Sequence, residues 1–149
     1  MLLRVVIDAN IFISYLLSPD DRFGAIARVF ESIGSGRYQL VRSERLISEI
    51  RTSVTGKPEL RKRISDADLE ELIALVEAVS IPLPDHPDVI APPILRDQKD
   101  DYLLEVAHRA NVDYLVSGDR DLLDIRDQLD RPQIVTPRAF LELMDAKLM

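Results

Sequence analysis

The sequence predicts an α/β protein, a three-layer α/β/α sandwich around a central, mostly parallel sheet. Short apolar runs alternate with longer segments in which apolar residues recur every three or four positions, as expected for strands that alternate with helices. The first of these strand candidates is apolar throughout, which is typical of a parallel strand covered on both faces. Strands joined through helices pair in parallel by right-handed crossovers. The chain has 149 residues, enough for one core, and we expect residues 1–149 to form a single domain.

The first half of the chain begins with a strand at residues 5–7, three β-branched residues in a row. A helix is expected to start near Ile11 and to stop at Ser18-Pro19, and Asp20 or Asp21 can cap the next helix. The elements that follow are the end of that helix at 34–36, a strand at 38–41, a helix capped by Ser43, a short basic helix beginning at Lys57-Pro58, a helix opened by Ser65 and a strand at 79–83.

The second half begins with the proline-rich segment 82–93, which is expected to be an irregular loop. Asp97 is expected to cap a helix that runs to Ala110, with Asn111 as its left-handed stop. The elements that follow are a strand at 114–116, a short helix through 122–125, a strand at 134–135 and a terminal helix beginning at Thr136-Pro137. Pro137 suits the first position of a helix, where its missing N–H costs nothing.

The composition excludes several kinds of site. The chain has no cysteine, so it can form neither disulfides nor thiolate zinc sites and has no cysteine nucleophile. Arg4 and Asp8 interrupt the apolar opening segment, and no run of the chain is long enough to cross a bilayer. We therefore expect a soluble, cytoplasmic protein that does not contact membranes.

The charge is unevenly distributed. The net charge of −7 argues against a generic basic nucleic-acid binder, yet residues 42–63 carry seven basic side chains against three acidic ones. Residues 66–130 carry seventeen acids against five bases. Such a distribution is compatible with a solvated acidic face, and equally with a basic rim beside an acidic, metal-binding centre.

Two aspartates stand where predicted strands end. Asp8 directly follows the strand at 5–7, and Asp119 follows Val116-Ser117-Gly118. Ligand crevices of open α/β sheets form at the carboxyl ends of strands, and a buried carboxylate there needs a compensating partner such as a cation. The alternative is that Asp8 or Asn10 caps the helix that starts near Ile11 and that Asp119 caps the short helix after it, and for either aspartate alone capping is the better explanation.

Two further acids lie on predicted helices beside apolar residues. Glu49 borders the apolar stripe of its helix, and Asp100 precedes Leu103 and Leu104 by three and four positions, on the core-facing side. If the strands are neighbours, four carboxylates converge at one edge of the sheet and repel each other unless cations bind. Oxygen ligands without histidine or cysteine favour Mg²⁺ or Mn²⁺. Pairing of Glu49 with an arginine, or stabilisation of Asp100 by the helix dipole, would explain each acid separately.

Four stretches of the chain match a known family: VVIDANIFIS, LVRSERLISEI, RDQKDDYLLEVAHRANVDYLVSGDRDLL and IVTPRAFLELM, which together span nearly all of it. On these stretches the chain resembles the PIN-domain family, and within it the VapC-like toxins of toxin–antitoxin pairs. The resemblance implies a Mg²⁺- or Mn²⁺-dependent ribonuclease whose metal site consists of Asp8, Glu49, Asp100 and Asp119. Asp97 or Asp101 is close enough in sequence to Asp100 to share its role.

The resemblance also implies roles for other residues and partners. Asn10 and Ser117 match polar positions that orient carboxylates or water around the metal. Hydrolysis of an RNA phosphodiester would leave a 5′-phosphate and a 3′-hydroxyl. Family members are often dimers, which implies a homodimer, and a small antitoxin that inserts an arginine into the acidic pocket is an expected partner. The basic side chains that could steer phosphates are Arg42, Arg45, Arg51, Arg61, Lys62 and Arg63.

Two other functions compete with this prediction. A phosphotransfer domain with Asp8 as phosphoryl acceptor usually carries a second aspartate two positions later, where this chain has Asn10. A PIN-fold module that binds RNA or protein without cutting would be indicated by the loss of one of the acids, and all four are present. The nuclease remains the favoured hypothesis.

Overall fold

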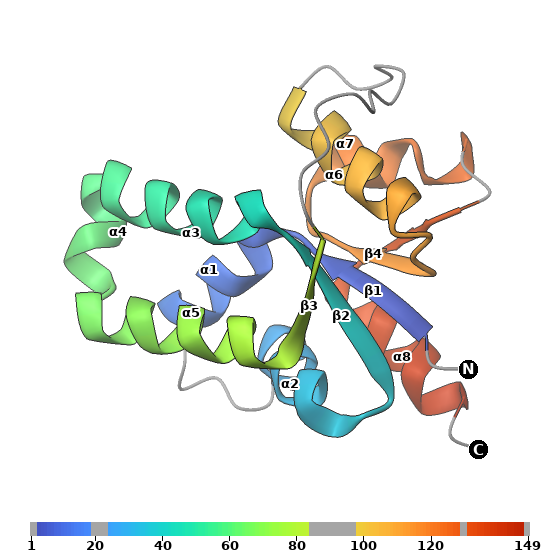
Figure 1. Ribbon diagram of the computed structural model, residues 1–149, viewed down its shortest axis with the longest axis horizontal. Helices are drawn as coiled ribbons and strands as arrows, with labels where there is room; N and C mark the ends of the chain where they lie inside the picture. The colour runs from blue at the N-terminus through green and yellow to red at the C-terminus, as the bar shows by residue number, and fades with distance from the viewer. Residues whose placement is uncertain (1–2, 19–23, 84–97, 129–130, 148–149) are drawn as a thin grey trace.

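The computed structural model describes residues 3–18, 24–83, 98–128 and 131–147, without the side chains of residues 98–101 and 146–147. The fold is the predicted α/β sandwich (Figure 1). Its five-stranded sheet has the order β3-β2-β1-β4-β5, and every pairing between the described strands is parallel. The strands are β1 (Leu3–Ile7), β2 (Tyr38–Ser43), β3 (Ser80–Leu83), β4 (Tyr114–Val116) and β5 (Gln133–Val135).

Helices cover both faces of this sheet (Figure 1). Val5 and Ile7 of β1 face one apolar core and Val6 faces the other, because successive side chains of a strand point to opposite faces. The helices of the first core are α1 (Ala9–Leu17), α2 (Ala25–Ser32), α3 (Glu44–Gly56), α5 (Asp66–Val79) and α8 (Pro137–Lys147). The helices of the second core are α6 (Gln98–Arg109) and α7 (Arg120–Asp124). β1 is thus buried on both faces, as its sequence predicts.

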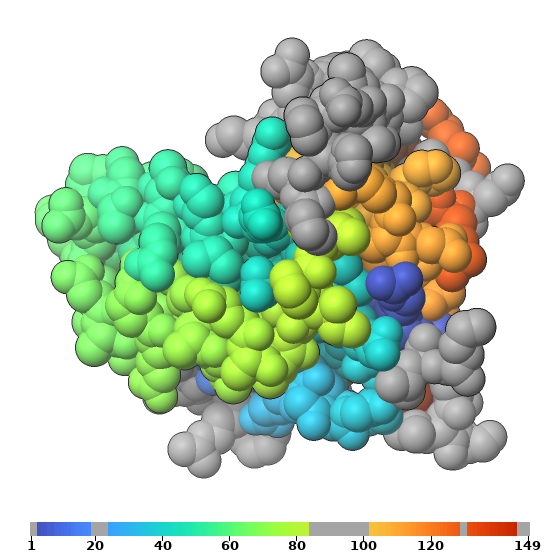
Figure 2. Space-filling model, viewed as in Figure 1, coloured from blue at the N-terminus to red at the C-terminus, as the bar shows by residue number. Residues whose placement is uncertain are grey.

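Helix α3 leaves the sheet edge and returns through α4 (Pro58–Arg63) and α5, so that the three helices form a lobe at one end of the molecule (Figures 1 and 2). Leu46, Ile50 and Val54 form the buried face of α3. On the outside, the guanidinium of Arg51 pairs with the Glu70 carboxylate of α5, with Nη2 and Oε2 3.0 Å apart. The two helices therefore contribute to the same apolar core and are joined on the outside by an ion pair.

Most of the predicted helix ends are confirmed. Ser43 and Ser65 cap α3 and α5 by accepting a hydrogen bond from the third residue along, and Pro137 is the first residue of α8. Asn111 stops α6 in the left-handed region, with φ of 53°. The proline-rich segment from residue 84 onward and the expected Asp97 cap lie outside the described residues.

Two helix starts differ from the prediction. Helix α1 begins at Ala9, two residues before the predicted start near Ile11, and Asp8 is its N-cap, as the capping alternative predicts. Helix α2 begins at Ala25 with the extended Gly24 as its N-cap, so the predicted cap at Asp20 or Asp21 is wrong, and these two residues lie outside the described part of the chain. Two 3₁₀ turns complete the described elements, η1 (Ile33–Ser35) and η2 (Arg126–Gln128). None of the helices in the described part of the chain combines the length and the apolar character that a membrane span requires.

Candidate active site at the carboxyl edge of the sheet

The candidate site lies where the strand order reverses. From β1 the chain moves outward to β2 and β3, and then returns to the other side of β1 to add β4 and β5. The crossovers next to β1 and β4 therefore diverge at the carboxyl ends of these two strands, which is where open α/β sheets form a crevice. Asp8 follows β1, and Ser117 and Asp119 follow β4. The four acids were predicted to converge if the strands that precede Asp8 and Asp119 are neighbours. These strands, β1 and β4, are paired directly.

Asp8 is a buried carboxylate, with only 5% of the residue exposed. Its backbone N–H extends the β1–β4 ladder by donating to the carbonyl of Val116 at 3.0 Å. Its side chain caps α1, accepting from the N–H of Asn10 at 3.4 Å, which is long for such a bond. Asp8 is thus an N-cap, as the capping alternative predicts, but this weak bond satisfies little of the hydrogen-bonding capacity of its carboxylate.

Ser117 connects the two strand ends. Its hydroxyl donates to Oδ2 of Asp8 at 2.8 Å and accepts the N–H of Asp119 at 3.0 Å, and the residue has no exposed surface. Asp119 in turn caps α7 by accepting the N–H of Asp121 at 2.9 Å. One buried hydroxyl therefore fixes the carboxylate of Asp8 and the backbone that carries Asp119.

The negative charge of Asp8 is poorly compensated by the described protein groups. Burial raises the pKa of Asp8 above its ordinary value of 3.8, and the charge of Asp119 raises it further. The hydrogen bond from Ser117 is the largest influence that lowers this pKa, but the direction remains upward. A bound cation would supply the missing compensation, and the oxygen donors present are those that Mg²⁺ and Mn²⁺ prefer.

A hollow of about 540 Å³ opens in front of Asp8. Asp8, Asn10 and Asp119 line it from the strand ends, and Glu49 lines it from α3. Leu103 of α6 contributes an apolar wall. The volume lies within the range of roughly 300–1,000 Å³ typical of small-ligand sites. Three of the four predicted acids therefore line a single hollow.

These three acids do not form a metal cage by themselves. Among the described side chains, no group of three acids or histidines lies close enough together to hold an ion. Asp100 lies in α6, but its side chain and that of Asp101 are not described, and Asp97 falls wholly outside the described residues. The helix that carries Asp100 does reach the hollow through Leu103, three positions further on.

Tyr102 joins α6 to the start of α3. Its hydroxyl is hydrogen-bonded to the hydroxyl of Ser43, which is also the N-cap of α3. The guanidinium carbon of Arg45 lies 4.6 Å from the centre of the Tyr102 ring, in the geometry of a cation–π contact. The helix of Glu49 and the helix of Asp100 are therefore held together next to the hollow.

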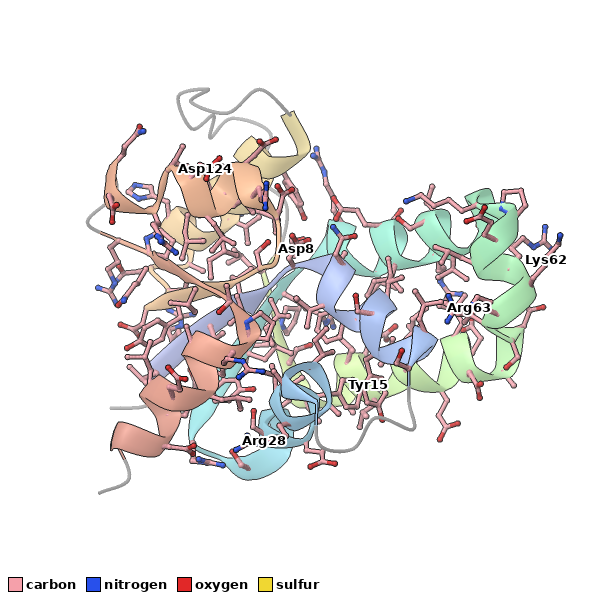
Figure 3. The ribbon with its side chains drawn as sticks, turned by 180° about the vertical axis from the view of Figure 1, so that it is seen from behind. Asp8, Tyr15, Arg28, Lys62, Arg63 and Asp124 are labelled. Carbon is pink, nitrogen blue, oxygen red and sulfur yellow. The ribbon has the colours of Figure 1, made fainter. Side chains whose placement is uncertain are left out.

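The predicted basic residues are scattered. Of the six, Arg45 lines the hollow, whereas Arg42 donates to the hydroxyl of Ser80 at 2.8 Å and Arg51 pairs with Glu70. Lys62 and Arg63 lie at the far end of the lobe from Asp8 (Figure 3), on the same short helix α4 as Arg61. These basic side chains do not form one patch around the acids.

Four residues at the hollow were missed from the sequence: Ser48, Thr52, Ser53 and Lys57. A signal for three of them existed, because Arg45, Ser48, Glu49, Thr52 and Ser53 follow the helical spacing of one face of α3. A polar helix face is usually only a solvated surface, so this spacing alone did not indicate a site.

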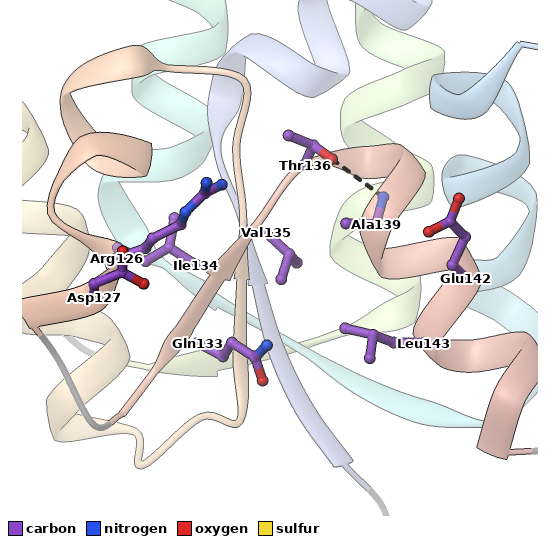
Figure 4. Close-up of a pocket in the computed structure, with 9 residues that line it drawn as sticks. All are labelled: Arg126, Asp127, Gln133, Ile134, Val135, Thr136, Ala139, Glu142 and Leu143. Atoms are coloured by element: carbon purple, nitrogen blue, oxygen red, sulfur yellow. Dashed lines mark hydrogen bonds between the residues drawn. The ribbon is translucent and has the colours of Figure 1, made fainter.

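A second hollow of about 480 Å³ lies beside the edge strand β5, between η2 and α8 (Figure 4). Arg126, Asp127 and Glu142 line it, and all three side chains are exposed. Thr136 at its margin caps α8 by accepting the N–H of Ala139 at 3.1 Å. Since its charged groups are solvated and none of them is buried as Asp8 is, this hollow is the weaker candidate for chemistry.

Comparison with known proteins agrees with this fold. A family model described as PIN domain matches residues 4–121, which include all of β1 except Leu3, together with α3, α6, β4 and the start of α7. The chain is 24% identical to the uncharacterized protein MJ1680 of Methanocaldococcus jannaschii, over 94% of this chain and 90% of that protein.

Two solved structures share the fold. One is PAE2754 from Pyrobaculum aerophilum, with a TM-score of 0.64 and 18% identity over 97% of this chain and 90% of that one. The other is VapBC2 from Rickettsia felis bound to a DNA fragment from its promoter, with a TM-score of 0.61 and 8% identity over 90% of this chain and 98% of that one. At these identities the likeness concerns the fold.

Proposed function

Because the chain belongs to the PIN domain family, we propose that it is a single-domain, Mg²⁺- or Mn²⁺-dependent endoribonuclease and the toxin of a toxin–antitoxin pair. The observation that carries the proposal is the buried, undercompensated carboxylate of Asp8 at a strand end, facing a hollow that Glu49 and Asp119 also line. An aspartate that only caps a helix does not need to be buried or to face a hollow that other carboxylates line.

In this proposal Asp8, Glu49, Asp100 and Asp119 hold the metal, directly or through water. Asp100 is included because it precedes Leu103, which lines the hollow, by three positions in α6, and residues three apart share a helix face. Either Asp97 or Asp101 remains an alternative for this fourth position. A bound divalent ion would activate water and neutralise charge on the phosphate.

The protein groups orient the reaction. Ser117 holds Oδ2 of Asp8 by donating to it, so that this carboxylate remains an acceptor. Asn10 lies at the mouth of the hollow, where its exposed side chain can orient water. Water adds to the phosphorus, the bond to the 3′ oxygen breaks, and that oxygen takes up a proton, which leaves a 5′-phosphate and a 3′-hydroxyl.

The decisive experiment is cleavage of end-labelled RNA by the wild-type chain with Mg²⁺ or Mn²⁺, with chelator, and by Asp8→Asn. We expect cutting that requires the metal and that the substitution abolishes. Asp145→Asn is the matched control, because Asp145 is an exposed acid of α8 that pairs with Arg28. This control variant should cut as the wild type does.

Other outcomes are equally informative. A chain that binds neither metal nor RNA would make the acids capping residues, and the nuclease proposal would fall. A chain that binds RNA without cutting it under any of these conditions would be the alternative, a non-cleaving PIN-fold module. Binding of Mg²⁺ without cleavage of several unrelated RNAs would contradict an endoribonuclease of broad substrate range.

The proposed partners follow from the same assignment. The fold is shared with VapBC2, and we propose a cognate antitoxin that fills the acidic hollow and silences it. We further propose a homodimer acting in the cytoplasm. Co-expression with the neighbouring gene product and light scattering of the purified chain test the antitoxin and the dimer separately.

A further inference from the structure

One face of α3 presents hydroxyl side chains between two cations. Starting from Arg45, the positions of Ser48, Thr52 and Ser53 follow at three, seven and eight residues, which places them on one side of a helix. Lys57 comes directly after the helix ends at Gly56. All five line the same hollow as Asp8, and we call this set the α3 stripe.

The α3 stripe is not explained by the stability of the fold. The opposite face of the helix, Leu46, Ile50 and Val54, is already buried in the core. Four stripe residues, Arg45, Ser48, Thr52 and Lys57, are exposed, so they contribute little to packing in the core. Burial therefore does not account for a row of polar side chains that faces Asp8.

The positive charges of the α3 stripe lie at its two ends. Arg45 lies over the ring of Tyr102, beside α6, and Lys57 lies where the chain turns into α4. Their positions differ by twelve, which corresponds to about 18 Å of helix at about 1.5 Å per residue. Glu49 lies within this span of α3, and Asp8 lines the same hollow from the end of β1. An anionic chain entering an acidic hollow is repelled unless cations hold it on both sides.

We infer that the α3 stripe binds the backbone of a single-stranded RNA, with Arg45 and Lys57 on phosphates at either side of Glu49 and the hydroxyls of Ser48, Thr52 and Ser53 between them. This inference rests on the proposed function and adds the path of the substrate. Serine and threonine hydroxyls are common partners of phosphate and sugar oxygens. Their small size also permits close approach of the RNA backbone to α3.

The direction of the path follows from α4. Its basic side chains, Arg61, Lys62 and Arg63, follow Lys57 by four to six positions, and Lys62 and Arg63 lie further along the lobe, away from Asp8 (Figure 3). RNA that leaves the hollow past Lys57 therefore continues over a positively charged surface. These basic residues of α4 are too distant to act on the scissile phosphate, and in this inference they bind the part of the RNA strand that leaves the hollow.

The first test measures binding without cleavage. Asp8→Asn chains, in chelator, are titrated with a fluorescent single-stranded RNA at several salt concentrations. Adding Lys57→Gln should weaken binding about fivefold and lower the slope of log K against log salt by about 0.7, the value for one phosphate contact on a single strand. The control is Arg28→Gln, which removes the same charge from α2, away from Asp8 in Figure 3, and should leave both quantities unchanged.

The second test locates the strand. Because the chain has no cysteine, one introduced cysteine is a unique attachment point for a photoreactive probe. A probe on Thr52→Cys should crosslink to the RNA, and one on Glu71→Cys, an exposed position of α5 outside the hollow, should not. Equal crosslinking from both positions would overturn the inference.

Failure of the inference and failure of the proposed function give different results. If the wild type cuts RNA but Lys57→Gln behaves like Arg28→Gln and Thr52→Cys gives no crosslink, the path is wrong and the nuclease stands. If the α3 stripe binds RNA that the wild type does not cut, the proposed RNA path is supported and the proposed nuclease activity is refuted. If no RNA binds at all, both the path and the nuclease activity are refuted.

Discussion

Ser117→Ala should destabilise the metal-free chain more at high pH than at low pH. The hydroxyl of Ser117 donates to Oδ2 of Asp8, so its removal leaves a buried carboxylate oxygen without that partner. Hydrogen bonds to charged groups contribute about 1.5–3 kcal/mol, and those between neutral groups about 0.5–1.5 kcal/mol. The cost of the substitution therefore depends on whether Asp8 is ionised.

The sign of the pH dependence follows from the pKa of Asp8. Burial raises this pKa in the folded state, so the stability that the carboxyl contributes is fully present below 3.8 and is lost as the pH rises through the folded value. The Ser117 bond lowers the pKa, so without it the pKa rises further and the loss with pH becomes larger. We expect a cost of about 1 kcal/mol at acid pH and about 2–3 kcal/mol at about pH 8.

Urea unfolding in chelator at the two pH values measures this difference. With a slope of about 2 kcal/mol per molar urea, the expected fall in midpoint is about 0.5 M at acid pH and more than 1 M at pH 8. Ser32→Ala is the matched control, because Ser32 is also buried but bonds the neutral Tyr38 hydroxyl at 3.0 Å and the carbonyl of Val29 at 2.6 Å.

The cost of Ser32→Ala should be the same at both pH values. A Ser117→Ala cost that is also independent of pH would refute the reasoning, as would an undiminished cost in an Asp8→Asn background, where no charge remains to be stabilised.

Three further predictions concern stability. Asp8→Asn should raise the melting temperature of the metal-free chain at neutral pH, because the raised pKa means that the ionised carboxyl disfavours folding; a lower melting temperature would contradict this. Phe140→Ala should cost about 3–5 kcal/mol in urea unfolding, since this ring has no exposed surface and packs edge-on against Tyr38 with centroids 5.2 Å apart; a cost below about 1 kcal/mol would mean that the core closes over the gap. Gly36→Ala should cost about 1–2 kcal/mol because its φ is 83°, whereas Gly34→Ala, with open space around it, should cost nothing, and equal midpoints for the two variants would refute the backbone argument.

The ends of the strands and helices could be predicted because their causes are local. A buried apolar run followed by a carboxylate marks Asp8 and Asp119, and the hydroxyls of Ser43 and Ser65 mark helix starts within three residues of sequence. The predicted cap of α2 was wrong because an extended glycine, Gly24, is the N-cap, and a glycine has no side chain that would mark the helix start in the sequence.

The long-range arrangement could not be predicted in the same way. Glu70 follows Arg51 by nineteen positions, and their ion pair exists only because α5 folds back along α3. Likewise, Lys57 looks in the sequence like one of seven similar basic residues, and only the packing of α3 against α1, the helix that Asp8 caps, brings it to the hollow. The side-chain position of Asp100 remains a prediction.

The bond between Ser117 and Asp8 joins residues that are 109 positions apart. During synthesis, β1 leaves the ribosome early, but its neighbour β4 and the hydroxyl that orients Asp8 follow only after most of the chain has been made. The hollow therefore cannot be completed by a partial chain. For the ribonuclease proposed above, this order of assembly would keep the unfinished protein from cutting the ribosomal RNA and the messenger RNA that are producing it.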